Sequence, residues 1–248
     1  MRRANVLIVI LLASVALLLI ACGKDREAAD SAAAQTTTQA PAATTATSAP
    51  TPQRTSDDGC RAVPPPEPAA NPDRRRPRTR LSRNRFWTAT ITTNCGTISI
   101  RLAVGRAPKT ASSFAALARS RFFDGLTFHR VAKPGGNDYV IQGGDPLGTG
   151  NGGPGYSVVE APPRNLRYDH YIAAMAKTQT EAPGTSGSQF FIVTAPNAAL
   201  PPEYALLGEV VGSKAAVDRI AAVPTDPAAE APLDPVVMSR VRISSRPR

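Results

Sequence analysis

The chain has 248 residues, a formal net charge of +10 and a sequence pI of about 10.2, with only two histidines and three cysteines. No Cys or carboxylate stands at ligand spacing around either histidine, so a zinc site is not expected. The sequence also gives no reason to expect an organic cofactor. Length alone allows one or two domains. The composition changes so strongly along the chain, however, that the first third is predicted to be non-globular.

The N-terminus is typical of an export signal. Arg2 and Arg3 precede an apolar run from Val6 to Ile20 that only Ser14 interrupts. This run of about 15 residues is shorter than the roughly 20 that span a bilayer, and it has the length of a signal-peptide core. Residues 1–21 are therefore predicted to be a signal peptide.

The end of this run, Leu19-Ile20-Ala21-Cys22, resembles the lipobox of bacterial lipoproteins, in which the cysteine is lipidated and becomes the new N-terminus. Each buried methylene of an acyl chain contributes about 0.8 kcal/mol, and stable anchoring needs more than one chain. A multiply acylated Cys22, carrying palmitate-type chains, would hold the protein at the outer face of the cell membrane. The alternative is ordinary secretory cleavage that leaves Cys22 unmodified.

Residues 22–85 are predicted to form a disordered tether. They are rich in Ala, Thr, Pro and Arg and have almost no large apolar side chains, so they cannot bury enough surface to offset the entropy of ordering. Seven arginines lie between Arg74 and Arg85. They suit either anionic lipid or an acidic cell-wall polymer, or they are simply a solvated charged linker, the interpretation that we favour. Without interleaved aromatic residues, nucleic acid is not an expected partner.

Cys60 and Cys95 are the cysteines that remain after Cys22 is assigned. An exported protein can form disulfides, and a bond between these two would join the end of the tether to the first predicted hairpin. The other alternative is two unpaired thiols, with Cys95 buried in a strand.

Residues 86–248 have the pattern of one globular domain. Two β-branched runs, at 87–93 and 97–103, surround Asn94-Cys95-Gly96 and predict a hairpin. Apolar residues at helical spacing predict helices at 108–120 and 213–222. Many short strands with two helices indicate a β-barrel or a sandwich; the remaining strands are predicted at 126–131, 139–142, 172–176, 190–194, 205–210 and 236–243.

Motifs of several common enzyme classes are absent. The chain has no G-x-S-x-G turn and no phosphate-binding G-x-x-x-x-G-K-[ST] loop. The glycines of GGDPLGTGNGGPGY lack the lysine and the following helix of such a loop, so they are predicted to form backbone turns.

Four motifs occur in a fixed order: Phe128-His129-Arg130, Gln142-Gly143-Gly144-Asp145, GTGNGGPGY, and GSQFFI from Gly187 to Ile192. Together they resemble the cyclophilin-type peptidyl-prolyl cis-trans isomerases, and the resemblance extends from about Trp87 to Ile243. It implies an all-β fold, a closed eight-stranded antiparallel β-barrel capped by two α-helices. It also implies an active site in a groove on the barrel surface.

The resemblance assigns site residues one by one. It implies that Arg130 stabilises the transition state and that Gln142 orients it, whereas His129 is structural. The implied catalytic residues are Arg130, Tyr139, Gln142 and Phe191, and the implied substrate-binding residues are Val140, Ala176, Lys177, Thr178, Gln189, Leu200 and Tyr204.

The chain departs from the family pattern at several of these positions. Lys177 replaces the usual Asn, which would shift preference toward acidic substrates. Tyr204 stands where many members have His. Ala199 stands where many have the Trp that binds cyclosporin, which puts sensitivity to that drug in doubt.

The function implied is a monomeric prolyl isomerase that acts on Pro-containing exported polypeptides. A cyclophilin-like module that binds proline peptides with little turnover is the main alternative. A cell-wall adhesion lipoprotein that acts through its arginines is the weaker one.

Overall fold

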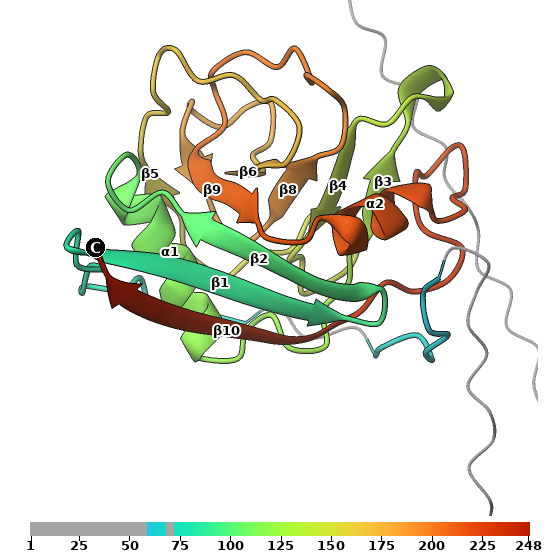
Figure 1. The fold of residues 1–248 in the computed structure, drawn as a ribbon, viewed down its shortest axis with the longest axis horizontal. Coiled ribbons are helices and arrows are strands. Elements are labelled where there is room, and N and C mark those ends of the chain that lie inside the picture. The colour runs from blue at the N-terminus through green and yellow to red at the C-terminus, as the bar shows by residue number, and fades with distance from the viewer. Residues whose placement is uncertain (1–58, 68–71) are drawn as a thin grey trace, which may run out of the picture. The chain divides into compact units, whose positions relative to one another are not determined.

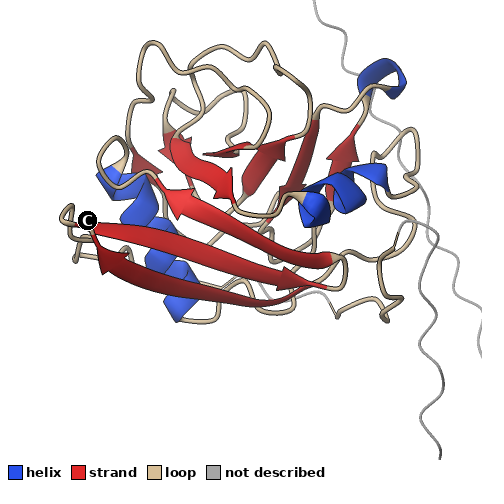
Figure 2. Ribbon diagram, in the orientation of Figure 1, coloured by secondary structure: helices blue, strands red, loops and turns tan. Residues whose placement is uncertain are grey.

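A computed structural model describes residues 59–67 and 72–248. The predicted signal peptide and Cys22 lie outside these ranges. Ten strands and two α-helices form the domain (Figures 1 and 2). In chain order they are β1 (Arg85–Thr93), β2 (Gly96–Leu102), α1 (Pro108–Arg119), β3 (Arg130–Ala132), the 3₁₀ turn η1 (Pro134–Gly136), β4 (Val140–Gly143), β5 (Val158–Val159), β6 (Ile172–Met175), β7 (Thr185–Ser186), β8 (Phe190–Val193), β9 (Leu206–Val211), α2 (Ala215–Ala222) and β10 (Met238–Pro247).

Eight of the strands form one curled antiparallel sheet in the order β10-β1-β2-β9-β6-β8-β4-β3, and β5 pairs with β7 separately. The eight-stranded antiparallel sheet was expected, but the prediction that it closes into a barrel is wrong. No ladder pairs the edge strands β3 and β10. The segments that precede them meet through the isolated bridge from Thr127 to Val237 and a few backbone hydrogen bonds, such as Phe128 N to Val236 O at 2.9 Å. The segment facing β3 contains Pro232 and Pro235, which have no N–H to continue a ladder.

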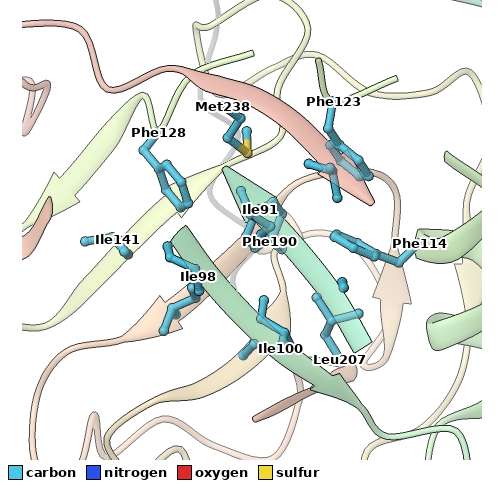
Figure 3. Packing of buried hydrophobic residues seen from close by; sticks show 14 of the residues in the cluster. Ile91, Ile98, Ile100, Phe114, Phe123, Phe128, Ile141, Phe190, Leu207 and Met238 are labelled. Atoms are coloured by element: carbon cyan, nitrogen blue, oxygen red, sulfur yellow. The ribbon is translucent and has the colours of Figure 1, made fainter. Parts of the chain in front are cut away.

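The inner face of the sheet holds the main hydrophobic core (Figure 3). Alternate residues of β1 and β2 point inward, so Ile91, Ile98 and Ile100 are all fully buried. Phe190 of β8 meets Phe114 of α1 edge to face, with ring centroids 5.5 Å apart. These aromatic contacts connect the helix to the centre of the sheet.

Both predicted helices are confirmed within two residues of their expected ends. Pro108 opens α1, where its missing N–H costs nothing, and the helix buries Ala111, Phe114 and Ala115. The shorter α2 buries Val217 and Ile220. In Figure 1 the two helices lie at opposite sides of the curled sheet.

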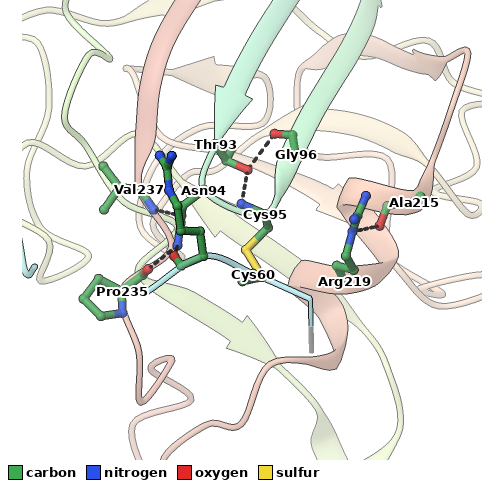
Figure 4. Close-up of a disulfide and its surroundings, with 10 residues drawn as sticks. Cys60, Thr93, Asn94, Cys95, Gly96, Ala215, Arg219, Pro235 and Val237 are labelled. Carbon is green, nitrogen blue, oxygen red and sulfur yellow. Dashed lines mark hydrogen bonds between the residues drawn. A yellow bond between two sulfur atoms is a disulfide. The ribbon is translucent and has the colours of Figure 1, made fainter. Parts of the chain in front are cut away.

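Part of the segment that was expected to be a disordered tether packs on the domain. Cys60 forms a disulfide with Cys95 in the turn between β1 and β2, and both residues are buried (Figure 4). Leu81 is also buried, and its N–H donates to Ser112 Oγ of α1 at 2.9 Å. Among the described residues, no helix has the length and apolar character to cross a membrane.

Candidate active site

Strand alternation and register place the predicted site residues on the outer face of the sheet. Arg130 of β3 pairs with Gln142 of β4, which pairs in turn with Phe191 of β8. Successive side chains of a strand point to opposite faces, so Phe190 enters the core while Phe191 faces outward with Val140. The neighbouring strands β3 and β4 and the more distant strand β8 thus bring one guanidinium, one amide and one aromatic ring into a row.

Side-chain hydrogen bonds fix the polar half of this row. The Arg130 Nη1 donates to Gln142 Oε1 at 3.2 Å, and Gln142 Nε2 donates to Gln189 Oε1 at 2.9 Å. Gln189 Nε2 then donates to the carbonyl oxygens of Gly150 and Gly152, at 2.8 and 2.9 Å. Each amide is therefore held in one orientation, and Gln142 keeps a second N–H for a ligand.

A carboxylate holds Arg130 from the opposite side. Arg130 Nε donates to Glu230 Oε2 at 2.6 Å, with side-chain exposures of 37% and 29%. Glu230 lies in the loop before β10, and its carbonyl oxygen accepts a hydrogen bond from Val131 N at 2.7 Å. Because Nε and one Nη1 hydrogen are used, the remaining guanidinium N–H groups are left for a ligand.

Aromatic rings form the apolar half of the site. Phe191 is buried and meets Tyr204 edge to face at 5.4 Å. Tyr168 lies behind both: its hydroxyl donates to Tyr204 O and accepts from Tyr204 N, and burial raises the pKa of Tyr168 to about 12. Burial also raises the pKa of Tyr139; nearby Tyr204 adds to this, and Arg130 opposes it. With Val140 and Leu200 these rings make a largely apolar surface suited to a proline ring.

A cavity of about 480 Å³ continues from this row. Its lining includes Gln142, Gln189, residues 150–157 and residues 176–178. Ala176 N donates to Gln189 O at 2.9 Å, which ties the two walls together. Thr178 is exposed at the far side, where its N–H and hydroxyl both donate to Glu181.

The Lys177 side chain does not point into open solvent. It is only 4% exposed, its Nζ lies 3.4 Å from Glu203 Oε2, and it lies over the Tyr204 ring at 5.7 Å. Because Glu203 already neutralises this ammonium group, the geometry does not support the expected preference for acidic substrates. Lys177 is nevertheless one of the residues that line the cavity.

The glycine motif QGGD shapes the bottom of the site. Gly144 has φ +86°, and a Cβ there would lie 2.6 Å from Ser188 O, so no other residue fits without movement. The buried Asp145 accepts from Leu147 N and Gly150 N, at 2.8 and 2.5 Å. Of the glycines that follow, Gly148, Gly150 and Gly155 lie in bends with positive φ, as the turn prediction requires, whereas Gly152 and Gly153 lie in loop without a turn.

His129 is a half-buried neighbour of the site. Both of its ring nitrogens are buried and have no hydrogen-bond partner among the described residues. Burial lowers the pKa of His129 below 6.5; Arg130 lowers it further, and Asp145 opposes the shift. The unfolded chain therefore binds this proton at a higher pH than the folded chain does. The free energy of unfolding should fall as pH falls below about 6.5, by at most about 1.4 kcal/mol per pH unit.

Urea unfolding between pH 5 and 7 measures this slope, in a window above the ordinary pKa of carboxylates. His129→Gln should flatten it. An unchanged slope in that variant would show that another group is responsible.

Sequence reasoning did not identify two functional neighbours. Glu230 lies 100 residues beyond Arg130 in an irregular loop, and no local pattern indicates their contact. Tyr168 lies 36 residues before Tyr204, and no local pattern indicates that contact either. Within the described ranges, no group of three or more His, Cys, Asp or Glu side chains is placed to hold a metal.

Comparison with known proteins agrees with this geometry. Residues 88–243 match the family described as cyclophilin type peptidyl-prolyl cis-trans isomerase/CLD. Peptidyl-prolyl cis-trans isomerase B of Streptomyces anulatus is 40% identical over 176 residues, 64% of this chain and 97% of that protein. Peptidyl-prolyl cis-trans isomerase A of Mycobacterium tuberculosis is 39% identical over 175 residues, 63% of this chain and 92% of that one.

A solved structure is similar as well. The cyclophilin type isomerase of Cryptosporidium parvum, crystallised in the presence of the dipeptide Ala-Pro, shares 31% identity. The match covers 64% of this chain and 99% of that one, with a TM-score of 0.58. Sequence, fold and site geometry lead to one conclusion: the chain belongs to the cyclophilin-type peptidyl-prolyl cis-trans isomerases.

Proposed function

We propose that this prolyl isomerase acts on Pro-containing exported polypeptides at the outer face of the cell membrane, and that Arg130 stabilises the twisted amide. The observation that carries the catalytic part is the row of Arg130, Gln142 and Phe191 on one face of the sheet. It combines a fixed cation with an apolar surface.

The physics of the reaction explains why such a site suffices. Rotation about an X-Pro bond is opposed by a barrier of roughly 18 to 20 kcal/mol, so uncatalysed exchange takes tens to hundreds of seconds. Lowering the barrier by about 7 kcal/mol brings exchange to milliseconds. No covalent bond to the substrate has to form.

Arg130 would supply an interaction that strengthens only as the bond twists. Twisting ends the amide resonance and localises a lone pair on the prolyl nitrogen, which the guanidinium N–H groups attract. Glu230 and Gln142 hold the guanidinium in place, so little reorientation is needed during the reaction. Phe191 and Tyr204 would hold the proline ring, worth about 1.5 to 3 kcal/mol of burial.

The location is supported by two kinds of observation. The disulfide between Cys60 and Cys95 belongs in an oxidising compartment, outside the cytoplasm. The apolar run and Leu19-Ile20-Ala21-Cys22 suit export followed by lipidation. Binding of the Arg74–Arg85 segment to anionic lipid or cell-wall polymer, and the monomeric state, stay predictions.

Cys22→Ser tests the anchor in the full chain expressed in a bacterial host. Without the acyl chains, the exported protein should move from the washed membrane fraction to the soluble one. Protease added to intact spheroplasts should digest the wild-type protein if it faces outward. Cys60→Ser is the matched control and should stay with the membrane; equal retention of the exported Cys22→Ser protein would refute the lipid anchor.

A further inference from the structure

Two stretches before β1, residues 59–67 and 72–84, form what we call the N-terminal strap. The strap lies outside the family match, which begins at residue 88. One end is fixed to the β1–β2 turn by the Cys60–Cys95 disulfide (Figure 4). A hydrogen bond from Arg61 N to Asn94 O, 2.9 Å long, fixes the same end. The other end is fixed to α1 through the buried Leu81.

Between these ends the strap contacts the glycine-rich loop that follows Asp145. Arg74 N donates to Pro154 O at 2.8 Å. Gly155, with φ +84°, lies so close that a Cβ there would be 2.9 Å from the Asp73 Cα. The next residue, Tyr156, is held from α1 by a 3.0 Å hydrogen bond between its hydroxyl and Ser113 Oγ.

The other side of the same loop is a wall of the substrate cavity. Residues 150–157 line that cavity together with Gln142 and Gln189. Gln189 also binds the carbonyl oxygens of Gly150 and Gly152, so the loop continues the hydrogen-bond series that begins at Arg130. The loop thus lies between the cavity and the strap.

A loop this rich in glycine has high conformational entropy when unsupported. Four glycines, at 150, 152, 153 and 155, stand within six residues. A peptide that enters the cavity would have to order the loop itself unless the loop is already held in place. If the loop is already ordered before the peptide binds, binding loses no entropy by ordering it, and the affinity is higher.

We infer that the N-terminal strap is a positioning element of the active site, which holds the 150–155 wall and so determines how well peptides longer than the X-Pro unit bind. This inference rests on the isomerase activity. The residues that act are Asp73 and Arg74, through their backbone. Leu81 fixes their own stretch to α1, and the disulfide fixes the stretch that precedes it in the chain. Short peptides that contact only Arg130 and Phe191 do not reach the 150–155 wall, so their binding should not depend on the strap.

Arg74→Pro in the full chain removes the N–H that binds Pro154 O. Arg75→Pro is the matched control, because its N–H makes no hydrogen bond that the structure shows. Exchange is measured by NMR with a three-residue and a ten-residue X-Pro peptide. For the long peptide, Arg74→Pro should raise KM about 2- to 10-fold, the range for one hydrogen bond, with kcat within about twofold. The short peptide should show no change.

The double variant Cys60→Ser/Cys95→Ser removes the disulfide, the other support. Under conditions in which this variant is folded, KM should again rise for the long peptide and stay unchanged for the short one. Unchanged KM for the long peptide in both variants would overturn the inference, and so would an equal rise for both peptides. Wild-type protein that accelerates neither peptide would instead refute the isomerase function on which the inference rests.

Discussion

Arg130→Ala should lower kcat/KM for cis-to-trans exchange by about 100- to 1,000-fold, the loss typical of removing one preorganised electrostatic donor. The effect should fall on kcat, because the guanidinium acts on charge that develops only as the amide twists. The fold should survive. Arg130 is 37% exposed, and Glu230 at 29% would be left in contact with water rather than buried and unpaired.

Two further variants make this test specific. Arg130→Lys keeps the charge but lacks the planar guanidinium group that donates to Glu230 and Gln142 at the same time. It should therefore recover only part of the rate. Arg101→Ala removes an exposed arginine of β2 far along the sheet and should leave the rate unchanged. If Arg130→Ala kept the wild-type rate, Arg130 would have no electrostatic role in the reaction. A folded wild-type protein that binds proline peptides without accelerating exchange would favour the peptide-binding module.

Phe190→Ala should lower the free energy of unfolding by about 3 to 5 kcal/mol, as expected for a large aromatic deleted from a packed core. The ring is fully buried and contacts Phe114, Phe123 and Phe128 at centroid distances of 5.5, 6.1 and 5.8 Å. The neighbouring side chains cannot fill the cavity that the deleted ring leaves unless α1 or the sheet shifts. Urea unfolding with the disulfide intact, followed by the fluorescence of Trp87, measures the change.

Phe191→Ala is the matched comparison because the two residues are neighbours on opposite faces of β8. Where Phe190→Ala is still folded, its kcat/KM should remain within a few-fold of wild type. Phe191→Ala should instead lower kcat/KM even at temperatures where it is fully folded. If both variants lost activity to the same extent under those conditions, the division between an inner core face and an outer catalytic face would be wrong.

The sequence predicts the elements of this fold well where apolar spacing is regular. The helix at 108–120 and the strand at 139–142 appear as Pro108–Arg119 and Val140–Gly143, because each carries a clear stripe or a β-branched run. The two-residue strands β5 and β7 were not predicted, since two residues carry no periodicity. The predicted closure of the barrel is wrong. Pro232 and Pro235 have no N–H groups, so they prevent a hydrogen-bonded ladder between their segment and β3.

The candidate site was predicted through motifs rather than through geometry. The motifs gave Arg130, Gln142 and Phe191, and the structure brings these three into one row. Contacts between distant loops carry no such signal, which explains why Glu230 was missed. Low hydrophobicity likewise concealed the strap, where a disulfide and a few backbone contacts replace a core.

The pairing of β1 with β10 has a consequence for the order of folding. The register joins Arg85 to Pro247, so the first strand of the domain completes its hydrogen bonds only when the last strand is present. Such distant contacts slow folding, because a long chain segment must close before they contribute. While the chain is being synthesised, one edge of β1 stays unpaired until residues 238–247 are available. The outward face of β1 is polar, because it carries Thr88, Thr90 and Thr92. This lowers the tendency of the unpaired strand to pair with other chains.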